Sequence, residues 1–270
     1  MSLVSDYSDG TPAMSYQLIN FSGDILAERH AGMTFYSAST IKLAVLVAAM
    51  QAVDQGALSL EMPMISTHTF TSGAPGHCPF SFEPEEYDAG LPPEGATMTL
   101  REVLGRMITV SSNEATNMVV ELLGFPAVNA ALAFCGAGDS MMERLIGDIE
   151  ALHAGLTHQV SARDLVGIML AIVGGRVAGP ELTQLMTRWL QAQEFPVIGL
   201  EIQAVDPLAS WGSKSGWVTG IQHDVAFVIP RDGRDDGGYI LAVCTRAYPD
   251  ADATEAIRTV TAMAHALAAG

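Results

Sequence analysis

Hydrophobic and polar residues follow two different repeats along this chain. Residues 16–21 alternate between the two classes, residues 22–24 form a turn by composition, and residues 25–27 return, which predicts an N-terminal β-hairpin. Near the other end, residues 224–229 and 239–244 are strand-like runs, and residues 231–238 between them have the composition of a turn.

Between these strands the apolar positions recur with helical spacing. Residues 40–55 predict a helix that ends at Gly56, and Thr99 with Glu102 has the spacing of a capping box. Further helices are predicted at residues 100–109, 113–123, 126–134, 162–173, 180–192 and 252–268. Residues 62–98 are rich in Pro, Gly, Ser and Thr, which predicts an extended loop.

This order of elements predicts an α+β fold. The strands of both chain ends would build one antiparallel sheet with flanking helices, and the helical block would be inserted as a second, all-helical lobe. We assign residues 14–60 and 195–270 to a discontinuous sheet lobe and residues 61–194 to the helical lobe.

Composition and charge narrow the possible partners. The 270 residues are 49% hydrophobic and 16% charged, which is typical of a globular chain. Thirty acidic against 13 basic residues give a net charge of −17, which argues against nucleic acid or an anionic membrane as the main partner. The composition does not predict the oligomeric state.

The chain also shows no segment that would direct it to a membrane. It contains no apolar window of 18 or more residues, so no membrane span is expected. No signal peptide is visible at the N-terminus, so we expect a cytoplasmic protein, with export possible if a leader has been removed. Three cysteines, Cys78, Cys135 and Cys244, fit reduced thiols better than a disulfide framework.

Candidate chemistry begins with Ser39 and Lys42. At this spacing both side chains lie on one helix face, and an apolar run follows directly at residues 43–50. A lysine packed against such a run is disfavoured in its charged form and can act as the base that activates a serine. The spacing alone equally fits an N-cap serine with a solvated lysine.

Two further motifs favour the catalytic interpretation of Ser39 and Lys42. Ser111 and Asn113 form an S-x-N triplet in the break between two predicted helices, and Lys214-Ser215-Gly216 precedes the strand at residues 224–229. Together with S-x-x-K, in this order, they resemble the motifs of class A β-lactamases and penicillin-binding proteins, over most of the chain. The resemblance implies the β-lactamase/transpeptidase-like fold, with a catalytic cleft between the two lobes.

The resemblance assigns a role to each motif residue. Ser39 attacks a carbonyl carbon, Lys42 takes or relays its proton, and Ser111 passes a proton to the leaving nitrogen. Asn113 would hold Lys42 and a substrate amide.

The third motif is expected to bind substrate. Lys214 would anchor a substrate carboxylate and Ser215 would donate to the same group, while Gly216 lets the backbone approach the substrate. By resemblance, the backbone N–H groups of Ser39 and Trp217 form the oxyanion hole.

One departure bears on turnover. The family places a glutamate, the base for deacylation, two residues after an arginine. If Arg144 matches that arginine, the glutamate position holds Ile146, which cannot act as a base. Asp148 and Glu150 are the alternative candidates for this base, or they form ion pairs that hold the loop.

We therefore expect a serine hydrolase that acts through a Ser39 acyl-enzyme, with a β-lactam amide as substrate. The alternatives are a peptidase or esterase for D-amino-acid peptides or small esters, and a protein that binds β-lactams without turnover. No cofactor is implied, and His68, His77 and Cys78 match no zinc pattern, so no metal is expected.

Overall fold

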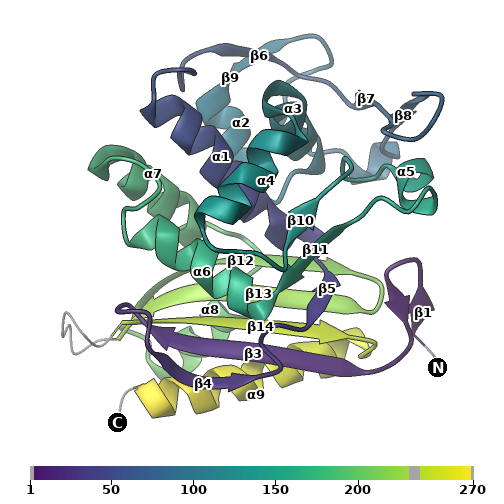
Figure 1. The fold of residues 1–270 in the computed structure, drawn as a ribbon. Coiled ribbons are helices and arrows are strands. Elements are labelled where there is room, and N and C mark those ends of the chain that lie inside the picture. Colours follow the sequence, from purple (N-terminus) through teal and green to yellow (C-terminus); the bar gives the residue numbers. More distant parts are fainter. Residues whose placement is uncertain (1–2, 231–237, 269–270) are drawn as a thin grey trace.

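A computed structural model describes residues 3–230 and 238–268 of the chain. Its main sheet is five-stranded and antiparallel, in the order β12-β13-β14-β3-β4 (Figure 1). The five strands are β12 (Ser210–Val218), β13 (Ile221–Ile229), β14 (Tyr239–Arg246), β3 (Ala13–Asn20) and β4 (Ile25–Arg29). The C-terminal strand β14 pairs with the N-terminal strand β3, with Leu241 opposite Leu18. The prediction of an α+β fold whose sheet is built from both chain ends is confirmed.

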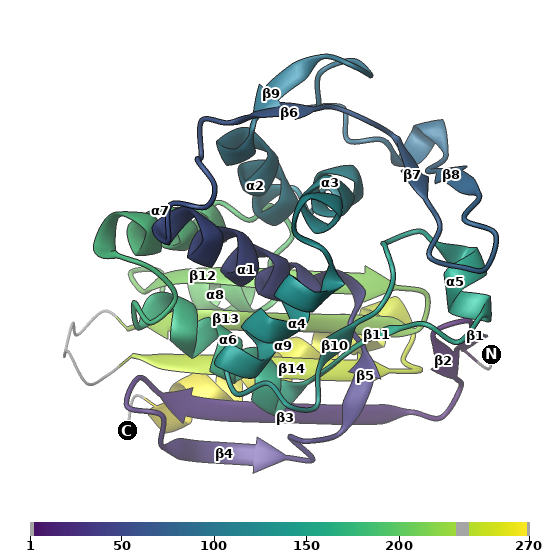
Figure 2. The same ribbon diagram turned by 45° about the horizontal axis from the view of Figure 1, so that its top comes forward.

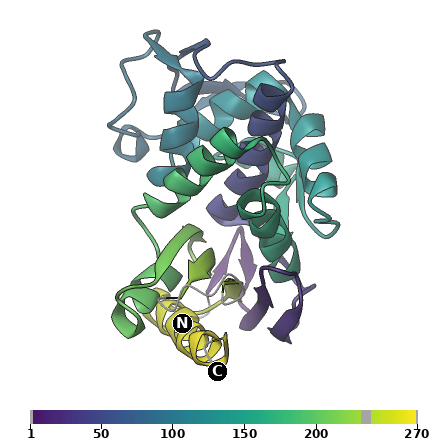
Figure 3. The same ribbon diagram turned by 90° about the vertical axis from the view of Figure 1, so that its left-hand side faces the viewer.

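Helices cover both faces of this sheet. On one face lie α8 (Ile198–Val205) and α9 (Asp250–Ala268), over a core that includes Leu18, Val228 and Leu241. Figure 3 shows α9 as the outermost layer on that side. On the opposite face α6 (Ala162–Val173) packs against β14, β13 and β3, and it joins the sheet to the remaining helices.

The helical part of the molecule surrounds one buried helix, α1 (Lys42–Asp54). Every residue from Lys42 to Met50 is buried, because neighbouring helices pack around α1 on several sides (Figure 2). Those neighbours are α2 (Leu100–Thr109), α3 (Asn113–Leu123), α4 (Phe125–Phe134), α6 and α7 (Pro180–Gln191). A helix that is apolar all round is expected in such a position.

Local sequence signals explain several helix starts. Thr99 caps α2 and forms the predicted capping box with Glu102, and Ser112 caps α3 by accepting a hydrogen bond from the N–H of Ala115.

The predicted lobe boundaries, residues 14–60 with 195–270 and residues 61–194, stay a prediction. In the structure α1 packs among the helices and α6 contacts both the sheet and α1.

The segment predicted as an extended loop contains regular structure. Residues 62–98 hold four short strands in two antiparallel pairs and one short 3-10 helix. They are β6 (Pro63–Ile65) with β9 (Thr97–Thr99), β7 (Thr69–Thr71) with β8 (Pro79–Ser81), and η2 (Pro84–Glu86). Strands this short carry too little periodicity to be recognised from sequence.

Other short elements complete the described chain. They are β1 (Val4–Ser5), β2 (Ser8–Asp9), β5 (Thr34–Tyr36), η1 (Ala38–Ile41), β10 (Met141–Met142), α5 (Ile149–His153) and β11 (His158–Ser161). The turn predicted at residues 231–238 lies largely outside the described residues. Within the described ranges no single helix is both long and apolar enough to cross a membrane; α3 and α4 reach that length and composition only together, across a bend of 93°.

Candidate active site

Ser39 lies in η1, the single turn that leads directly into α1. Its neighbours Ala38, Thr40 and Ile41 are buried, whereas Ser39 is partly exposed. Within the described chain its Oγ takes part in no hydrogen bond. The turn therefore presents one hydroxyl to a ligand from an otherwise buried segment.

Lys42, the first residue of α1, is fully buried, and its ammonium group faces α3. Its Nζ donates to the carbonyl of Ser111 at 2.5 Å, to Ser111 Oγ at 3.2 Å and to Asn113 Oδ1 at 2.8 Å. Burial and then the positive charge of Lys214 hold the pKa of Lys42 well below its ordinary value. A lysine whose pKa is lowered is neutral over a wider range of pH, and in its neutral form it can act as a base.

Ser111 connects two lysines that come from distant parts of the sequence. Lys214 Nζ, from β12, lies 3.0 Å from the same Ser111 Oγ that lies 3.2 Å from Lys42 Nζ. Ser111 also has a φ of 60°, a left-handed conformation that a serine seldom adopts. Strained backbone of this kind is concentrated at functional sites, where the surrounding structure holds it in place.

Lys214 is buried in the sheet beside its motif partner Ser215. Burial lowers the pKa of Lys214 to about 7, and the carboxylate of Asp224 opposes that effect. Its Nζ also donates to the carbonyl of Ser215 at 2.7 Å. A cation at this position is suited to a substrate carboxylate, which would restore its positive charge.

Gly216 is the point at which β12 touches the turn that carries Ser39. A Cβ added to Gly216 would lie 2.5 Å from the Ser39 nitrogen and 2.9 Å from the Thr40 nitrogen. Only glycine allows this contact, because both neighbouring atoms belong to the backbone. Trp217 follows directly after this contact on β12.

Gln193, which the sequence did not single out, lies against the same strand. Its Nε2 donates to Ser215 Oγ at 3.0 Å and to Ser213 Oγ at 3.4 Å, and the side chain is 4% exposed.

Asp224 holds the start of α8, because its Oδ2 accepts the N–H groups of Val197 and Ile198 at 2.8 Å each. Burial raises the pKa of Asp224 to about 6.

The main chain of Ile146 is attached to α3. The side-chain amide of Asn117, on α3, binds the carbonyl and the N–H of Ile146 at 2.9 Å each. The segment after Arg144 is thus attached to the helix that starts at Asn113. The residue presented there is aliphatic, so it supplies no base.

The carboxylate of Asp148 is engaged in hydrogen bonds with neighbouring segments. Its carboxylate caps α5 through the N–H of Ala151, and it accepts bonds from Ser72 Oγ at 2.7 Å and from the Gly73 N–H at 2.8 Å. Glu150 is exposed in the first turn of α5. Neither forms a described hydrogen bond with Ser39, Lys42 or Ser111, and a role of either as deacylation base stays a prediction.

Glu114 places a buried carboxylate next to the Ser111–Asn113 motif. The buried Glu114 accepts from Ser112 Oγ at 3.3 Å and from the Asp88 N–H at 2.8 Å. Its charge raises the pKa of Lys42, against the larger effect of burial. Glu114 is therefore close enough to Lys42 for their charges to interact.

The histidines of residues 62–98 form no metal site with other described side chains. His68 stacks on Tyr87 with ring centroids 3.9 Å apart, and its Nδ1 is 3.4 Å from Glu114 Oε1. Across residues 3–230 and 238–268, no three His, Cys, Asp or Glu side chains are grouped to hold a metal ion.

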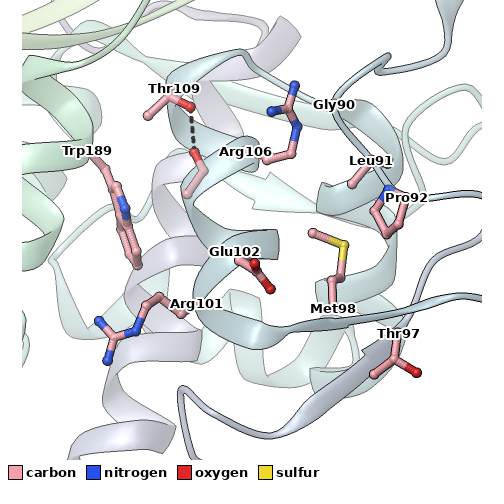
Figure 4. Close-up of a pocket in the computed structure, with 11 residues that line it drawn as sticks. Gly90, Leu91, Pro92, Thr97, Met98, Arg101, Glu102, Arg106, Thr109 and Trp189 are labelled. Carbon is pink, nitrogen blue, oxygen red and sulfur yellow. Dashed lines mark hydrogen bonds between the residues drawn. The ribbon is translucent and has the colours of Figure 1, made fainter.

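A separate hollow of about 680 Å³ lies beside α2. Figure 4 shows the Trp189 indole on one side of this helix, and Leu91 and Pro92 on the other. Its two arginines already have acidic partners, since Arg101 binds Glu61 and Arg106 binds Asp88. None of the motif residues lines this hollow, so the candidate site is the one around Ser39.

Comparison with known proteins points to the β-lactamases, by family and by fold. The model of the β-lactamase enzyme family matches residues 3–268. A solved β-lactamase from Sphaerobacter thermophilus DSM 20745 shares 25% identity, over 94% of this chain and 90% of its own, with a TM-score of 0.75. A search of curated protein sequences found no match.

Other solved structures share the fold at lower identity. PBP-A has 23% identity over 94% of this chain and 89% of its own, with a TM-score of 0.77, and a single-residue mutant of it was solved as an acyl-enzyme complex with penicillin G. L2, solved with relebactam, has 18% identity over 95% of this chain and 91% of its own, with a TM-score of 0.77.

Proposed function

Because this chain belongs to the β-lactamase enzyme family, we propose that it is a serine hydrolase that forms an acyl-enzyme on Ser39, with a β-lactam amide as its substrate. The family match over residues 3–268 confirms the resemblance that the three motifs predicted. The observation that carries the proposal is the pair of contacts by which Ser111 Oγ joins Lys42 to Lys214.

The geometry supports a specific path for the protons. Ser39 Oγ would attack the carbonyl carbon while its proton moves to Lys42, whose pKa is lowered by burial. Ser111 would then protonate the leaving nitrogen and recover a proton from the lysine side, because its hydroxyl touches both ammonium groups.

The third motif would bind and polarise the substrate. Lys214 and Ser215 would hold the substrate carboxylate, and the N–H groups of Ser39 and Trp217 would stabilise the oxyanion. Loss of one such donor costs roughly 3 to 4 kcal/mol in the barrier. The close contact at Gly216 supports this role, because it brings β12 against the Ser39 turn.

Slow release of the acyl group follows from the residue at position 146. Asn117 fixes Ile146 by two backbone hydrogen bonds, and no carboxylate is presented at that position. This favours a long-lived acyl-enzyme, as in a penicillin-binding peptidase or a protein that traps β-lactams, over rapid hydrolysis. A D-amino-acid peptidase or esterase that uses the same acyl-enzyme is the second candidate function.

Intact-protein mass spectrometry with benzylpenicillin over time tests the proposal. We expect an adduct of the mass of the intact penicillin that maps to Ser39, persists after removal of free drug, and is absent in Ser39→Ala. Ser22→Ala, in the turn after β3, is the matched control and should acylate normally. Absence of an adduct together with ester turnover would indicate an esterase, and an adduct on Ser39→Ala would overturn the assignment.

A further inference from the structure

Two exposed aromatic side chains stand beside the Lys214-Ser215-Gly216 strand. Phe195 and Trp217 pack edge to face, with ring centroids 5.2 Å apart and ring planes inclined at 64°. Yet 44% of Phe195 and 50% of Trp217 remain exposed. Such a pair offers an apolar and electron-rich surface to a ligand.

The pair forms one wall of a hollow of about 270 Å³. Its other lining residues are Ile221, Gln222 and Asp250. Trp217 and Gln222 are directly opposite each other on β12 and β13, and Asp250 is the first residue of α9. The hollow therefore combines two aromatic rings, one aliphatic side chain, one amide and one carboxylate.

Strand geometry places this hollow on a defined side of the reaction centre. Ser215 and Trp217 are two residues apart on β12, so their side chains point to the same face. Gln193 makes the same connection, because it donates to Ser215 Oγ and accepts the N–H of Phe195. In a β-lactam the carboxylate sits next to the ring nitrogen that is expelled. A hollow beside the carboxylate anchor is thus on the leaving-group side.

The charges around the hollow favour a cation. Neither Lys nor Arg is among its lining residues. Arg246 pairs in register with Ile221, but its Nε is directed to the Asp9 carboxylate, 3.4 Å away, and to the Thr11 carbonyl. The dipole at the start of α9 is equivalent to about half a positive charge, and the full negative charge of Asp250, which lines the hollow, outweighs it.

We propose that Phe195, Trp217 and Asp250 form a subsite for a cationic group that the substrate carries on its leaving-group side, next to its carboxylate. The aromatic faces attract the cation through their quadrupoles, and Asp250 supplies the opposite charge. The subsite rests on the proposed function, since Ser39 acylation is the event that would report its occupancy.

Two cephalosporins provide a matched pair of probes. Cephaloridine and cephalothin share the ring system and the acyl side chain, and differ in the substituent beside the carboxylate, which is a pyridinium in the first and a neutral acetoxy group in the second. The measurement is the second-order rate of Ser39 acylation by each compound, followed by mass spectrometry. Comparison of the rate ratio between protein variants removes the intrinsic difference in reactivity.

The wild-type ratio in favour of cephaloridine should fall ~5- to 10-fold in Asp250→Asn and in Phe195→Leu, because each change removes one source of attraction. Asp252→Asn is the matched control, since it removes the same charge from the same helical turn outside the hollow, and it should keep the wild-type ratio.

Each other outcome has a distinct meaning. An unchanged ratio in Asp250→Asn and Phe195→Leu overturns the subsite while the proposed function stands. An equal fall in Asp252→Asn also overturns it, because the charge would then act at long range. If neither compound acylates Ser39 in the wild type, the proposed function fails and the subsite fails with it.

Discussion

The side-chain amide of Asn117 holds the main chain of Ile146 from both sides. Its Nδ2 donates to the Ile146 carbonyl and its Oδ1 accepts the Ile146 N–H, both at 2.9 Å. Asn117 is fully buried and belongs to the same helix as Asn113. Position 146 is therefore rigidly placed relative to the site, and its side chain alone decides whether a base is present there.

Replacement of this side chain should change the lifetime of the acyl-enzyme. In Ile146→Glu the carboxylate would enter a position that is already oriented, and a positioned general base accelerates a reaction by ~10²- to 10⁴-fold. We expect the Ser39 adduct with benzylpenicillin to decay at least ~10²-fold faster than in the wild type. The decay is measured by mass spectrometry after removal of free drug.

Ile146→Gln is the matched control, because it has the shape and polarity of the glutamate variant without its basicity. Its adduct should persist as in the wild type. An adduct of equal lifetime in the glutamate variant would show that position 146 does not face the acyl group.

Gly216→Ala should block acylation. The new methyl group would meet the backbone nitrogens of Ser39 and Thr40 at 2.5 and 2.9 Å, so β12 or the Ser39 turn must move. A displacement of about 1 Å in a catalytic group costs about 10²-fold in rate. We expect at least that loss in the acylation rate, measured with benzylpenicillin.

Gly138→Ala is the corresponding control. A Cβ at Gly138 meets no atom within 4 Å, and its acylation rate should equal that of the wild type. Normal acylation of Gly216→Ala would contradict the close approach of β12 to the Ser39 turn.

Acylation should depend on pH through both lysines. Lys42 must be neutral to accept a proton, and its pKa is lowered by burial, so the rate should rise as pH increases through that lowered value. Lys214 must be charged to bind a carboxylate, and its pKa is about 7, so affinity should fall as pH increases beyond that value. The second-order acylation rate should therefore pass through a maximum.

Lys214→Arg separates the two limbs of this profile. An arginine stays charged, so the descending limb should disappear while the ascending limb remains. A descending limb that persists in this variant would assign the loss to a group other than Lys214.

Glu114→Gln should move the ascending limb toward lower pH. The Glu114 carboxylate stabilises the charged form of Lys42, so removal of its charge lowers the pKa of Lys42 further, and the neutral base forms at lower pH. The measurement is the same acylation profile. Glu61→Gln removes an equal charge from an exposed site paired with Arg101, and its profile should not shift.

Much of this site could be predicted from sequence because its motifs are short and local. Ser39 and Lys42 are three residues apart, and Ser111 with Asn113 and Lys214-Ser215-Gly216 are compact triplets. The cap at Thr99 and the strands at both chain ends are likewise local patterns, of side-chain hydrogen bonding and of alternating hydrophobicity. The short strands at residues 63–99 lacked that repeat and were missed.

Gln193, Phe195 and Glu114 had no such signal. Gln193 reaches Ser215 across 22 residues, and Phe195 meets Trp217 only because the segment before α8 folds back along β12. Glu114 is one of many acidic residues in the sequence, and only its burial beside Ser112 distinguishes it.

The sequence by itself determined the family, the long helices and the strands at both chain ends, and it offered Ser39 and Lys42 as the candidate nucleophile and base, because these depend on residue type and on spacing within one element. The tertiary structure decided which polar groups meet: Ser111 touches lysines 69 and 103 residues away, and Asn117 fixes Ile146 from 29 residues away. The apolar repeat determines which face of each element is buried. It does not determine which side chains of two buried faces come within hydrogen-bond distance of each other, and the chemistry of this site depends on those contacts.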